Sequence, residues 1–97
     1  MKKYRITEQA LVDIELIQDY FLERRPEHIA VLQREFVAKF LRVARFPMLG
    51  IDSSHLSPGL RRVFVRDYVI YYRRDNSMAL IIRVLHGARD IDASFFE

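Results

Sequence analysis

Residues 60–86, LRRVFVRDYVIYYRRDNSMALIIRVLH, contain the pattern that decides the fold of this chain. Branched and aromatic residues dominate three runs within this stretch, as they do in β-strands. The three runs span residues 60–66, 68–73 and 78–86. Short polar segments at residues 66–67 and 73–77 separate the runs and are typical of turns. The sequence therefore predicts three consecutive strands in an antiparallel meander.

A first helix is predicted upstream of the meander, over residues 8–25. Its N-cap is Thr7, whose hydroxyl can accept a free backbone N–H of the first turn. Apolar residues then recur at three- and four-residue steps, the spacing of one helix face, at Leu11, Ile14, Ile17 and Phe21. The residues from Lys3 to Thr7 are predicted to form a short strand that leads into this helix.

A second helix follows a corner at Pro26, because proline cannot continue a helix but suits the first turn of a new one. An apolar stripe then extends from Ile29 to Ala44, and Pro47 ends it. Residues 47–59 hold two of the three prolines and two of the three glycines, which predicts a loop. Two helices joined by so short a corner form an antiparallel hairpin. The expected fold is α+β with the order βααβββ, in which the N-terminal strand and the helical hairpin pack on an antiparallel sheet.

Length and composition limit the remaining possibilities. The chain has 97 residues, which predicts a single domain over residues 1–97, and its 51% hydrophobic and 30% charged residues are typical of a folded globule. It contains no cysteine, which excludes disulfides, thiolate zinc sites and a cysteine nucleophile, and which fits a reducing compartment. No apolar run is long enough to span a bilayer. We therefore expect a cytoplasmic protein without a membrane segment or a secretion signal.

Arginine dominates the basic residues. The formal net charge is only +3, but 13 of the 16 basic residues are arginine. The planar guanidinium pairs bidentately with carboxylate or phosphate, so an arginine-rich face suggests an anionic partner, either nucleic acid or an acidic protein. The alternative is that these arginines pair with the 13 acidic residues of the chain over an ordinary solvated surface.

The meander is the most basic third of the chain. Residues 60–90 hold seven arginines and three aspartates, interleaved with Tyr68, Tyr71 and Tyr72. The candidate partner-binding residues in it are Arg61, Arg62, Arg83, His86 and Arg89. Strand alternation places Arg83 on the face opposite Ile82, Val84 and His86, so these groups do not all meet on one surface.

Two interpretations of this basic cluster remain open. Arginine with histidine could cleave RNA through in-line attack of the 2′-hydroxyl, which makes Arg61, Arg62, Arg83 and His86 the catalytic candidates if the chain is a nuclease. In the structural interpretation, the tyrosines pack across strands, and Arg73 and Arg74 are solvated at a hairpin tip.

Other constellations predict no chemistry. Asp13 and Glu15 stand two apart on a helix and point to different sides, so they cannot share acid and base roles. His28, His55 and His86 fall in three different elements without a carboxylate at a recognised metal spacing. We therefore expect no metal site and no cofactor.

The last residues, 90–97, are predicted to form a short helix or a docked tail. This segment contains the adjacent residues Phe95 and Phe96, and two adjacent exposed phenylalanines would be unusual. The tail is therefore expected to pack on the sheet of its own chain or on a partner.

Several segments, taken together and in order, resemble the ParE branch of the RelE/ParE superfamily of bacterial toxins from type II toxin–antitoxin systems. The resemblance covers nearly the whole chain. It rests on Ala10, Asp13, Ile14, Ile17 and Tyr20 in the first helix and on the segments FPMLG at 46–50, PGLR at 58–61, YVIYYR at 68–73 and IRVLHGARD at 82–90. The family's fold, a helical hairpin on an antiparallel sheet, agrees with the order expected from the residues.

This resemblance implies a toxin that is not itself an enzyme. Such a toxin poisons DNA gyrase, so that cleaved DNA accumulates and replication stops. It also implies an acidic, ParD-like antitoxin whose partly disordered segment folds across the toxin and meets its arginines with carboxylates. The antitoxin binds operator DNA, so the toxin is expected to reach that DNA only through the antitoxin, in a toxin–antitoxin hetero-oligomer.

Two other members of the same superfamily remain possible. A RelE-like ribosome-dependent mRNA endonuclease shares the fold but carries basic and acid–base residues on the sheet. The chain has only three lysines, none of them between residues 60 and 90, and its net charge is small for docking on a ribosome. The third possibility is an inactive member that serves only as a binding or regulatory module.

Overall fold

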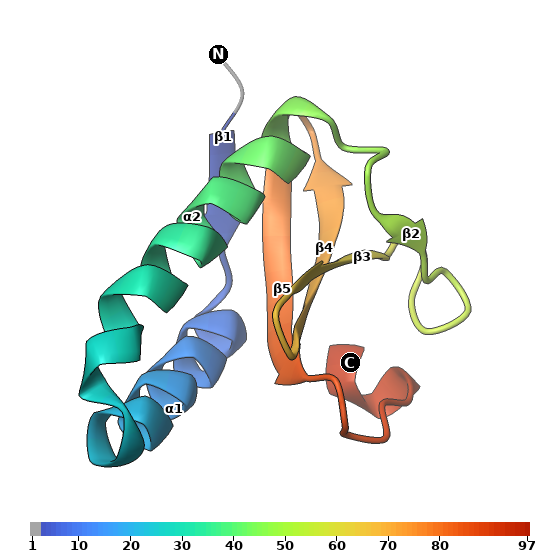
Figure 1. Ribbon diagram of the computed structural model, residues 1–97. Coiled ribbons are helices and arrows are strands. Elements are labelled where there is room, and N and C mark those ends of the chain that lie inside the picture. The colour runs from blue at the N-terminus through green and yellow to red at the C-terminus, as the bar shows by residue number, and fades with distance from the viewer. Residues whose placement is uncertain (1–2) are drawn as a thin grey trace.

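The computed structural model describes residues 3–97, and it places two helices against one face of a five-stranded sheet (Figure 1). Met1 and Lys2 lie outside the described residues, so the expectation that the chain starts without a secretion signal is not tested there. The elements in chain order are β1 (Lys3–Ile6), α1 (Glu8–Arg24), the 3₁₀ helix η1 (Pro26–His28), α2 (Ile29–Arg45), β2 (Ile51–Asp52), β3 (Arg61–Val65), β4 (Tyr68–Asp75), β5 (Met78–His86) and the 3₁₀ helix η2 (Ala93–Phe96). The predicted α+β class is confirmed, and the helical hairpin and the three-strand meander are present.

The helix boundaries follow local chemistry. Thr7 caps α1 as predicted, because its side chain accepts the backbone N–H of Ala10 at 3.1 Å. Pro26 begins the separate turn η1 instead of the first turn of α2, and α2 starts at Ile29. This is a small correction, since the proline still forms the corner and still occupies a first turn, where its missing N–H is not needed.

The strand order is β1-β5-β4-β3-β2. The meander of β3, β4 and β5 is antiparallel as predicted, but β1 pairs in parallel with β5, so the sheet is mixed. The two-residue strand β2 was not predicted, and it lies in the segment expected to be a loop, paired with Arg61 and Arg62 of β3. Sequence patterns do not detect β2 because two residues show no alternation.

A β-bulge in β5 changes which side chains share a face. Tyr71 pairs with Arg83 whereas Tyr72 pairs with Ile81, so Ile82 is the extra residue. Ile82 packs with Tyr71 on the face that bears Arg83, and the prediction that Ile82 lies opposite Arg83 is therefore wrong. Val84 does lie on the opposite face, as predicted.

The hairpin between β4 and β5 is tighter than the sequence suggested. β4 continues through Arg73 and Arg74 to Asp75, so the turn consists of Asn76 and Ser77. Arg73 and Arg74 are strand residues beside the turn and not its tip, which corrects the prediction. Asn76 adopts a φ of 56°, a left-handed conformation that asparagine tolerates better than most residues.

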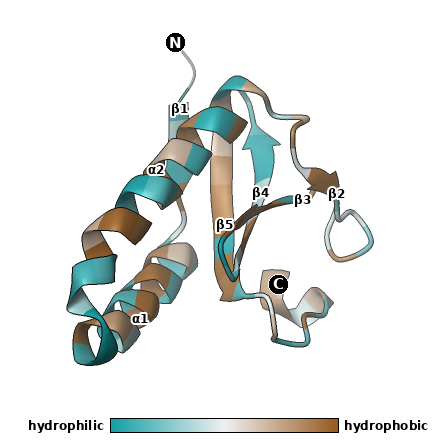
Figure 2. Cartoon of the chain, in the orientation of Figure 1, coloured by the Kyte–Doolittle hydropathy of each residue, from teal (hydrophilic) through white to brown (hydrophobic). Residues whose placement is uncertain are grey.

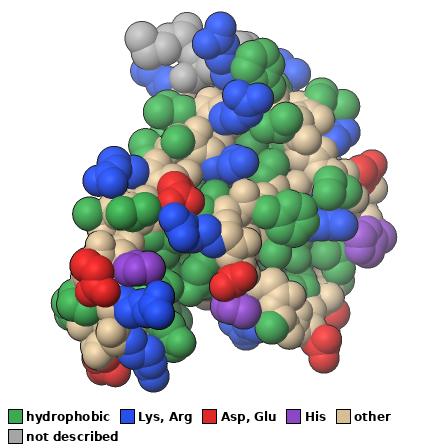
Figure 3. All heavy atoms as spheres, viewed as in Figure 1, with side chains coloured by type: hydrophobic (Ala, Val, Ile, Leu, Met, Phe, Trp, Pro, Cys, Tyr) green, Lys and Arg blue, Asp and Glu red, His purple; other side chains and the backbone are tan. Residues whose placement is uncertain are grey.

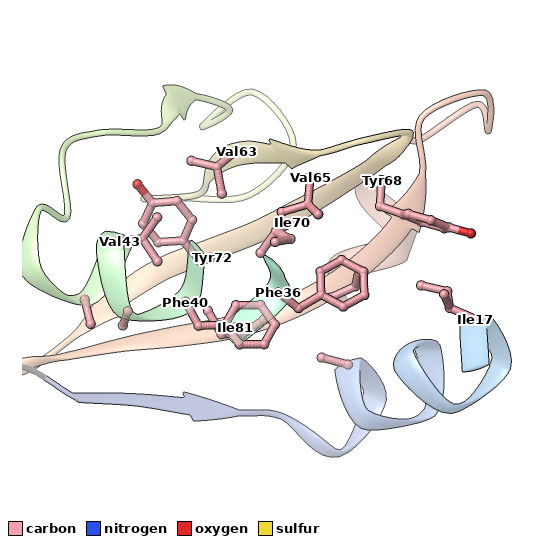
Figure 4. Packing of buried hydrophobic residues seen from close by; sticks show 14 of the residues in the cluster. Ile17, Phe36, Phe40, Val43, Val63, Val65, Tyr68, Ile70, Tyr72 and Ile81 are labelled. Carbon is pink, nitrogen blue, oxygen red and sulfur yellow. The ribbon is translucent and has the colours of Figure 1, made fainter. Parts of the chain in front are cut away.

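The main core fills the space between the helices and the sheet (Figure 4). Both helices show alternating hydrophobic and hydrophilic bands, as expected when one face of each is buried (Figure 2). The largest fully buried core side chains from these elements are Phe40, Val43, Ile70, Tyr72, Ile81 and Val84.

The C-terminal tail packs on the other face of the sheet. It forms η2, and the centroid of the Phe96 ring lies 4.9 Å from that of Tyr71. The predicted short helix and docked tail are therefore one feature, and it packs on its own sheet. This second, smaller core consists of Leu60, Val69, Tyr71 and Leu85, with Leu56, Ile82, Ile91, Phe95 and Phe96 packed against it.

Candidate partner-binding groove

A groove of about 1010 Å³ lies between the helical hairpin and the end of the sheet where β5 finishes. It opens at the notch in the lower edge of the space-filling view (Figure 3). The walls come from α1, the corner of the hairpin, the start of α2, the turn between β3 and β4, and the end of β5. Elements distant in sequence thus form one concave surface.

The interior of the groove is apolar. Ile17, Leu32, Tyr68 and Val84 line it and belong to the main core. Leu16 lines the α1 wall, and 62% of its surface is exposed. A protruding leucine beside a hollow with apolar walls is the kind of feature that a partner's apolar side chains cover.

The rim of the groove is mainly basic. Arg24, Arg25, Arg66 and Arg89 line it, with His28 and His86, against the carboxylates of Asp13 and Asp67. The Asp13 carboxylate is neutralised by Arg83, which does not line the groove. An apolar interior with a basic rim fits an amphipathic segment that carries acidic residues.

Arg66 is fixed in position by an ion pair with α2. Its Nε donates to both carboxylate oxygens of Glu35 at 3.0 Å, and its Nη2 donates to one of them at 2.7 Å. The hydrogen bonds from Arg66 lower the pKa of Glu35 below its usual value. The pair connects the turn after β3 with the helical hairpin across the groove.

His86 and Arg89 both lie at the groove. The His86 imidazole is exposed and stands edge-on to Tyr68, with ring centroids 5.5 Å apart. Its Nδ1 accepts the backbone N–H of Ala88 at 3.0 Å, so a neutral His86 carries its proton on Nε2. The Arg89 guanidinium lies 5.0 Å from the centroid of the Phe95 ring. The burial of Tyr68 raises the pKa of its hydroxyl, which favours a neutral phenol there.

Arg83 has a structural position at the edge of the sheet. Its Nε and Nη2 donate to the two carboxylate oxygens of Asp13 at 2.8 and 2.9 Å, and its Nη1 donates to the carbonyl oxygen of Phe95 at 3.1 Å. β1 pairs with β5 only as far as Ile81, and beyond that point Asp13 accepts the backbone N–H of Val84 at 3.0 Å. Asp13 thus replaces a strand neighbour for β5. The prediction that Asp13 and Glu15 point to different sides is confirmed, since Asp13 is buried and Glu15 is exposed.

Arg61 and Arg62 belong to β3, near the opposite edge of the sheet, which is formed by β2. Arg61 Nη1 donates to the carbonyl oxygen of Gly50 at 2.7 Å, and Arg62 Nη1 donates to Ser53 Oγ at 2.7 Å. Because they are successive strand residues, they project to opposite faces. Both half-buried side chains hold the segment between α2 and β3 against the sheet.

The five candidate residues therefore do not form one site. Only His86 and Arg89 line the groove, Arg83 joins α1 to the tail, and Arg61 and Arg62 hold the β2 segment. The groove residues on the hairpin were not identified from the sequence. A signal was present, because the α1 residues Leu16, Ile17, Tyr20 and Arg24 recur at steps of three and four residues and therefore lie on one side of the helix. Arg66 was not identified because only the fold brings that turn opposite α2.

The cluster does not assemble on one face of the sheet. Arg61 pairs with Tyr72 and His86 pairs with Tyr68, both tyrosines of the helix-facing core. Tyr71 points to the other face of the sheet, where Phe96 packs against its ring. Its partner on β3 is Arg62 and its partner on β5 is Arg83. Among residues 3–97, no group of three or more potential metal-ligating side chains comes together, and no helix is long and apolar enough to cross a membrane.

Comparison with known families agrees with this architecture. A sequence model of the family described as "ParE toxin of type II toxin-antitoxin system, parDE" matches residues 4–91. The chain belongs to the ParE toxin family. The resemblance inferred from its segments is confirmed.

Individual relatives add detail. The chain is 39% identical to Toxin ParE3 of Caulobacter vibrioides over 54 residues, which are 56% of this chain and 54% of the relative. It thus spans about half the length of the curated relative that it matches. A solved structure titled "Chromosomal ParDE TA system from P. aeruginosa" superposes with a TM-score of 0.73 over 89% of this chain and 96% of that one, at 18% identity. At that identity, the superposition supports the fold of this ParE toxin and no further property.

Proposed function

We propose that this ParE toxin inhibits DNA gyrase and is neutralised by a cognate acidic antitoxin that binds the groove. The proposal starts from the family and adds two features of this chain: the groove with its apolar interior and basic rim, and a sheet face that its own tail covers. The expected compartment is the cytoplasm, where both gyrase and the antitoxin would be met.

The groove supports the antitoxin part of the proposal. An acidic amphipathic segment would place apolar side chains against Leu16 and Tyr20 and carboxylates near Arg66 and Arg89. Arg66 is already oriented by Glu35, so it loses little side-chain freedom on binding. The net charge of +3 adds a modest long-range attraction for an acidic partner.

The covered sheet face is the observation that favours gyrase inhibition over mRNA cleavage. A nuclease of the alternative kind needs cations and an acid–base residue that converge on one accessible phosphate. In this chain, Arg83 is engaged by Asp13, the tail lies over Tyr71 between Arg62 and Arg83, and His86 lies on the opposite face. The nuclease residues are therefore not arranged for in-line attack.

The experiment that tests the proposal uses purified toxin with gyrase, ATP and relaxed plasmid. We expect supercoiling to stop and linear plasmid to accumulate, because a poison traps the cleaved intermediate. The same protein is added to a translation extract as a comparison, where we expect intact mRNA. Normal supercoiling together with codon-specific mRNA cuts would contradict the proposal and support the RelE-like alternative.

A further inference from the structure

The two helices of the hairpin carry opposite charge. α1 holds Glu8, Asp13, Glu15, Asp19 and Glu23 against Arg24, so its formal charge is 1 − 5, or −4. α2 holds Arg34, Lys39, Arg42 and Arg45 against Glu35, so its formal charge is 4 − 1, or +3. Asp13 is buried and paired with Arg83, but the other four acids of α1 are exposed. An ordinary solvated surface mixes both signs, whereas the exposed charges of this hairpin are largely separated by helix.

We name the four basic residues of α2, Arg34, Lys39, Arg42 and Arg45, the basic ridge. Arg66 neutralises the one acid of α2, Glu35, while no ion pair within residues 3–97 involves a residue of the ridge. The three arginines are exposed and Lys39 is half-buried. Basic side chains follow the ridge that α2 forms in the space-filling view (Figure 3).

The spacing of the ridge suits an extended anion. At about 3.6 residues per turn, the four cations fall within about 140° of the helix circumference, so they lie on one side of the helix. Arg45 lies eleven positions after Arg34, a span of about 16 Å at the usual helical rise. The guanidinium carbons of Arg42 and Arg45 lie 5.8 and 5.4 Å from the centroid of the Phe46 ring, which limits their motion at the end of the ridge.

Helix stability explains only part of this arrangement. Arg42 and Arg45 lie in the last turn, where cations interact favourably with the helix dipole. Arg34 and Lys39 lie outside that turn and gain nothing from it. Glu35 lies next to Arg34, but it is already neutralised by Arg66, so a compensating anion from outside the chain would stabilise the ridge.

We propose that the basic ridge binds the phosphate backbone of double-stranded DNA. Duplex DNA is a stiff rod with one negative charge about every 1.7 Å of its axis, and it suits cations distributed along one side of a helix. A single-stranded ligand would favour aromatic platforms, but Phe46 at the end of the ridge is flanked by two guanidiniums. Contacts of this kind position a protein on DNA without reading its sequence.

This inference goes beyond gyrase inhibition and is independent of it. The sequence predicted contact with operator DNA only through the antitoxin, whereas the ridge adds a direct contact by the toxin. The acidic α1 would face away from the duplex, so the charge separation also sets the orientation of the toxin on DNA.

The test measures binding of the purified, antitoxin-free chain to a short fluorescent duplex by anisotropy, between about 50 and 200 mM salt. We expect micromolar binding at the low-salt end and a slope of log K against log salt of about −3.6, as four phosphate contacts require. The double variant Arg42→Gln/Arg45→Gln should reduce the slope to about −2. The matched control, Arg24→Gln/Arg25→Gln, removes the same charge from the end of α1 and should keep the slope of the unmodified chain.

Three results would overturn the proposal. The first is no binding of the duplex at low salt by chains whose circular dichroism spectra show the native fold. The second is an equal loss of slope in the ridge variant and in the control, which would indicate a response to net charge alone. The third is competition by polyglutamate as effective as competition by unlabelled duplex, which would assign the ridge to an acidic protein.

Discussion

Arg83 joins three parts of the molecule through one guanidinium. It contacts α1 through Asp13 and the tail through the carbonyl oxygen of Phe95, and its own backbone belongs to β5. The side chains of Arg83 and Asp13 are only 12% and 5% exposed. A buried ion pair stabilises little compared with apolar residues, but removal of one partner leaves an uncompensated charge.

Asp13→Asn should therefore lower the free energy of unfolding by about 3 kcal/mol, because Arg83 keeps its charge in a nearly buried position. Urea denaturation measures this change. Glu15→Gln is the matched control, since it removes the same charge from an exposed site two residues away and should change the free energy by less than about 0.5 kcal/mol. Equal effects of the two variants would show that the ion pair does not hold α1 to β5.

Glu35 gives a test of the ion pair at the groove rim. Its pKa is lowered from the ordinary 4.5, first by the hydrogen bonds from Arg66. Because the folded-state pKa is depressed, the pair stabilises the fold above the ordinary pKa, and this contribution is lost as the pH falls through the folded-state value. In an NMR titration, Glu35 should titrate below 4.5 and return toward it in Arg66→Gln. An unchanged midpoint in that variant would contradict the assigned cause.

The Tyr72 hydroxyl, like Arg61 and Arg62, holds the segment between α2 and β3. Tyr72 Oη donates to the carbonyl oxygen of Pro47 at 2.8 Å and accepts the backbone N–H of Gly50 at 2.8 Å. A Cβ on Gly50 would lie 2.6 Å from that oxygen, so only glycine allows this approach. Arg61 adds a bond to the Gly50 carbonyl, and β2 is thereby placed at the sheet edge.

Tyr72→Phe should destabilise the protein by about 2 kcal/mol, because a buried donor and acceptor lose their shared partner. Thermal unfolding followed by circular dichroism measures the loss. Tyr71→Phe is the control, since the Tyr71 hydroxyl makes no hydrogen bond within residues 3–97. Equal losses in the two variants would argue against the role of the Tyr72 hydroxyl.

Elements with a regular pattern were predictable from the sequence, and contacts between distant elements were not. The repeat of Leu11, Ile14 and Ile17 locates α1, and the branched runs locate β3 to β5, because local periodicity reports which side of an element is buried. The bulge at Ile82, the pairing of β2 and the partnership of Asp13 with Arg83 depend on residues far apart in the chain. Strand alternation did predict that the candidate residues would not all share one surface, but the three places over which the fold distributes them depend on such long-range contacts.

At the scale of the whole molecule, the chain presents three distinct surfaces. The groove has an apolar interior and a basic rim, the far face of the sheet is covered by the tail, and the basic ridge lies along α2. These surfaces do not overlap, since no residue of the ridge lines the groove. Under the two proposals, the antitoxin and the DNA duplex would therefore contact different sides of the chain.

Two leucines of α1 distinguish the groove from the rest of the helix. Leu16 and Leu22 are 62% and 63% exposed, but only Leu16 lines the groove. Leu16→Glu should weaken antitoxin binding by about ten-fold or more, because it places a charge in an apolar contact and repels an acidic segment. Leu22→Glu should change the affinity by less than about three-fold. Calorimetric titration compares them, and equal effects would remove the antitoxin from the groove.

The most direct test of the account is a gyrase cleavage assay titrated with the cognate antitoxin. Toxin alone should convert relaxed plasmid to linear DNA in the presence of gyrase, and one equivalent of antitoxin should restore supercoiling. With the Leu16→Glu toxin, poisoning should persist at the same antitoxin concentration, because the groove no longer captures the neutralising segment. Uninterrupted supercoiling by gyrase in the presence of excess toxin, without any linear plasmid, would contradict the account.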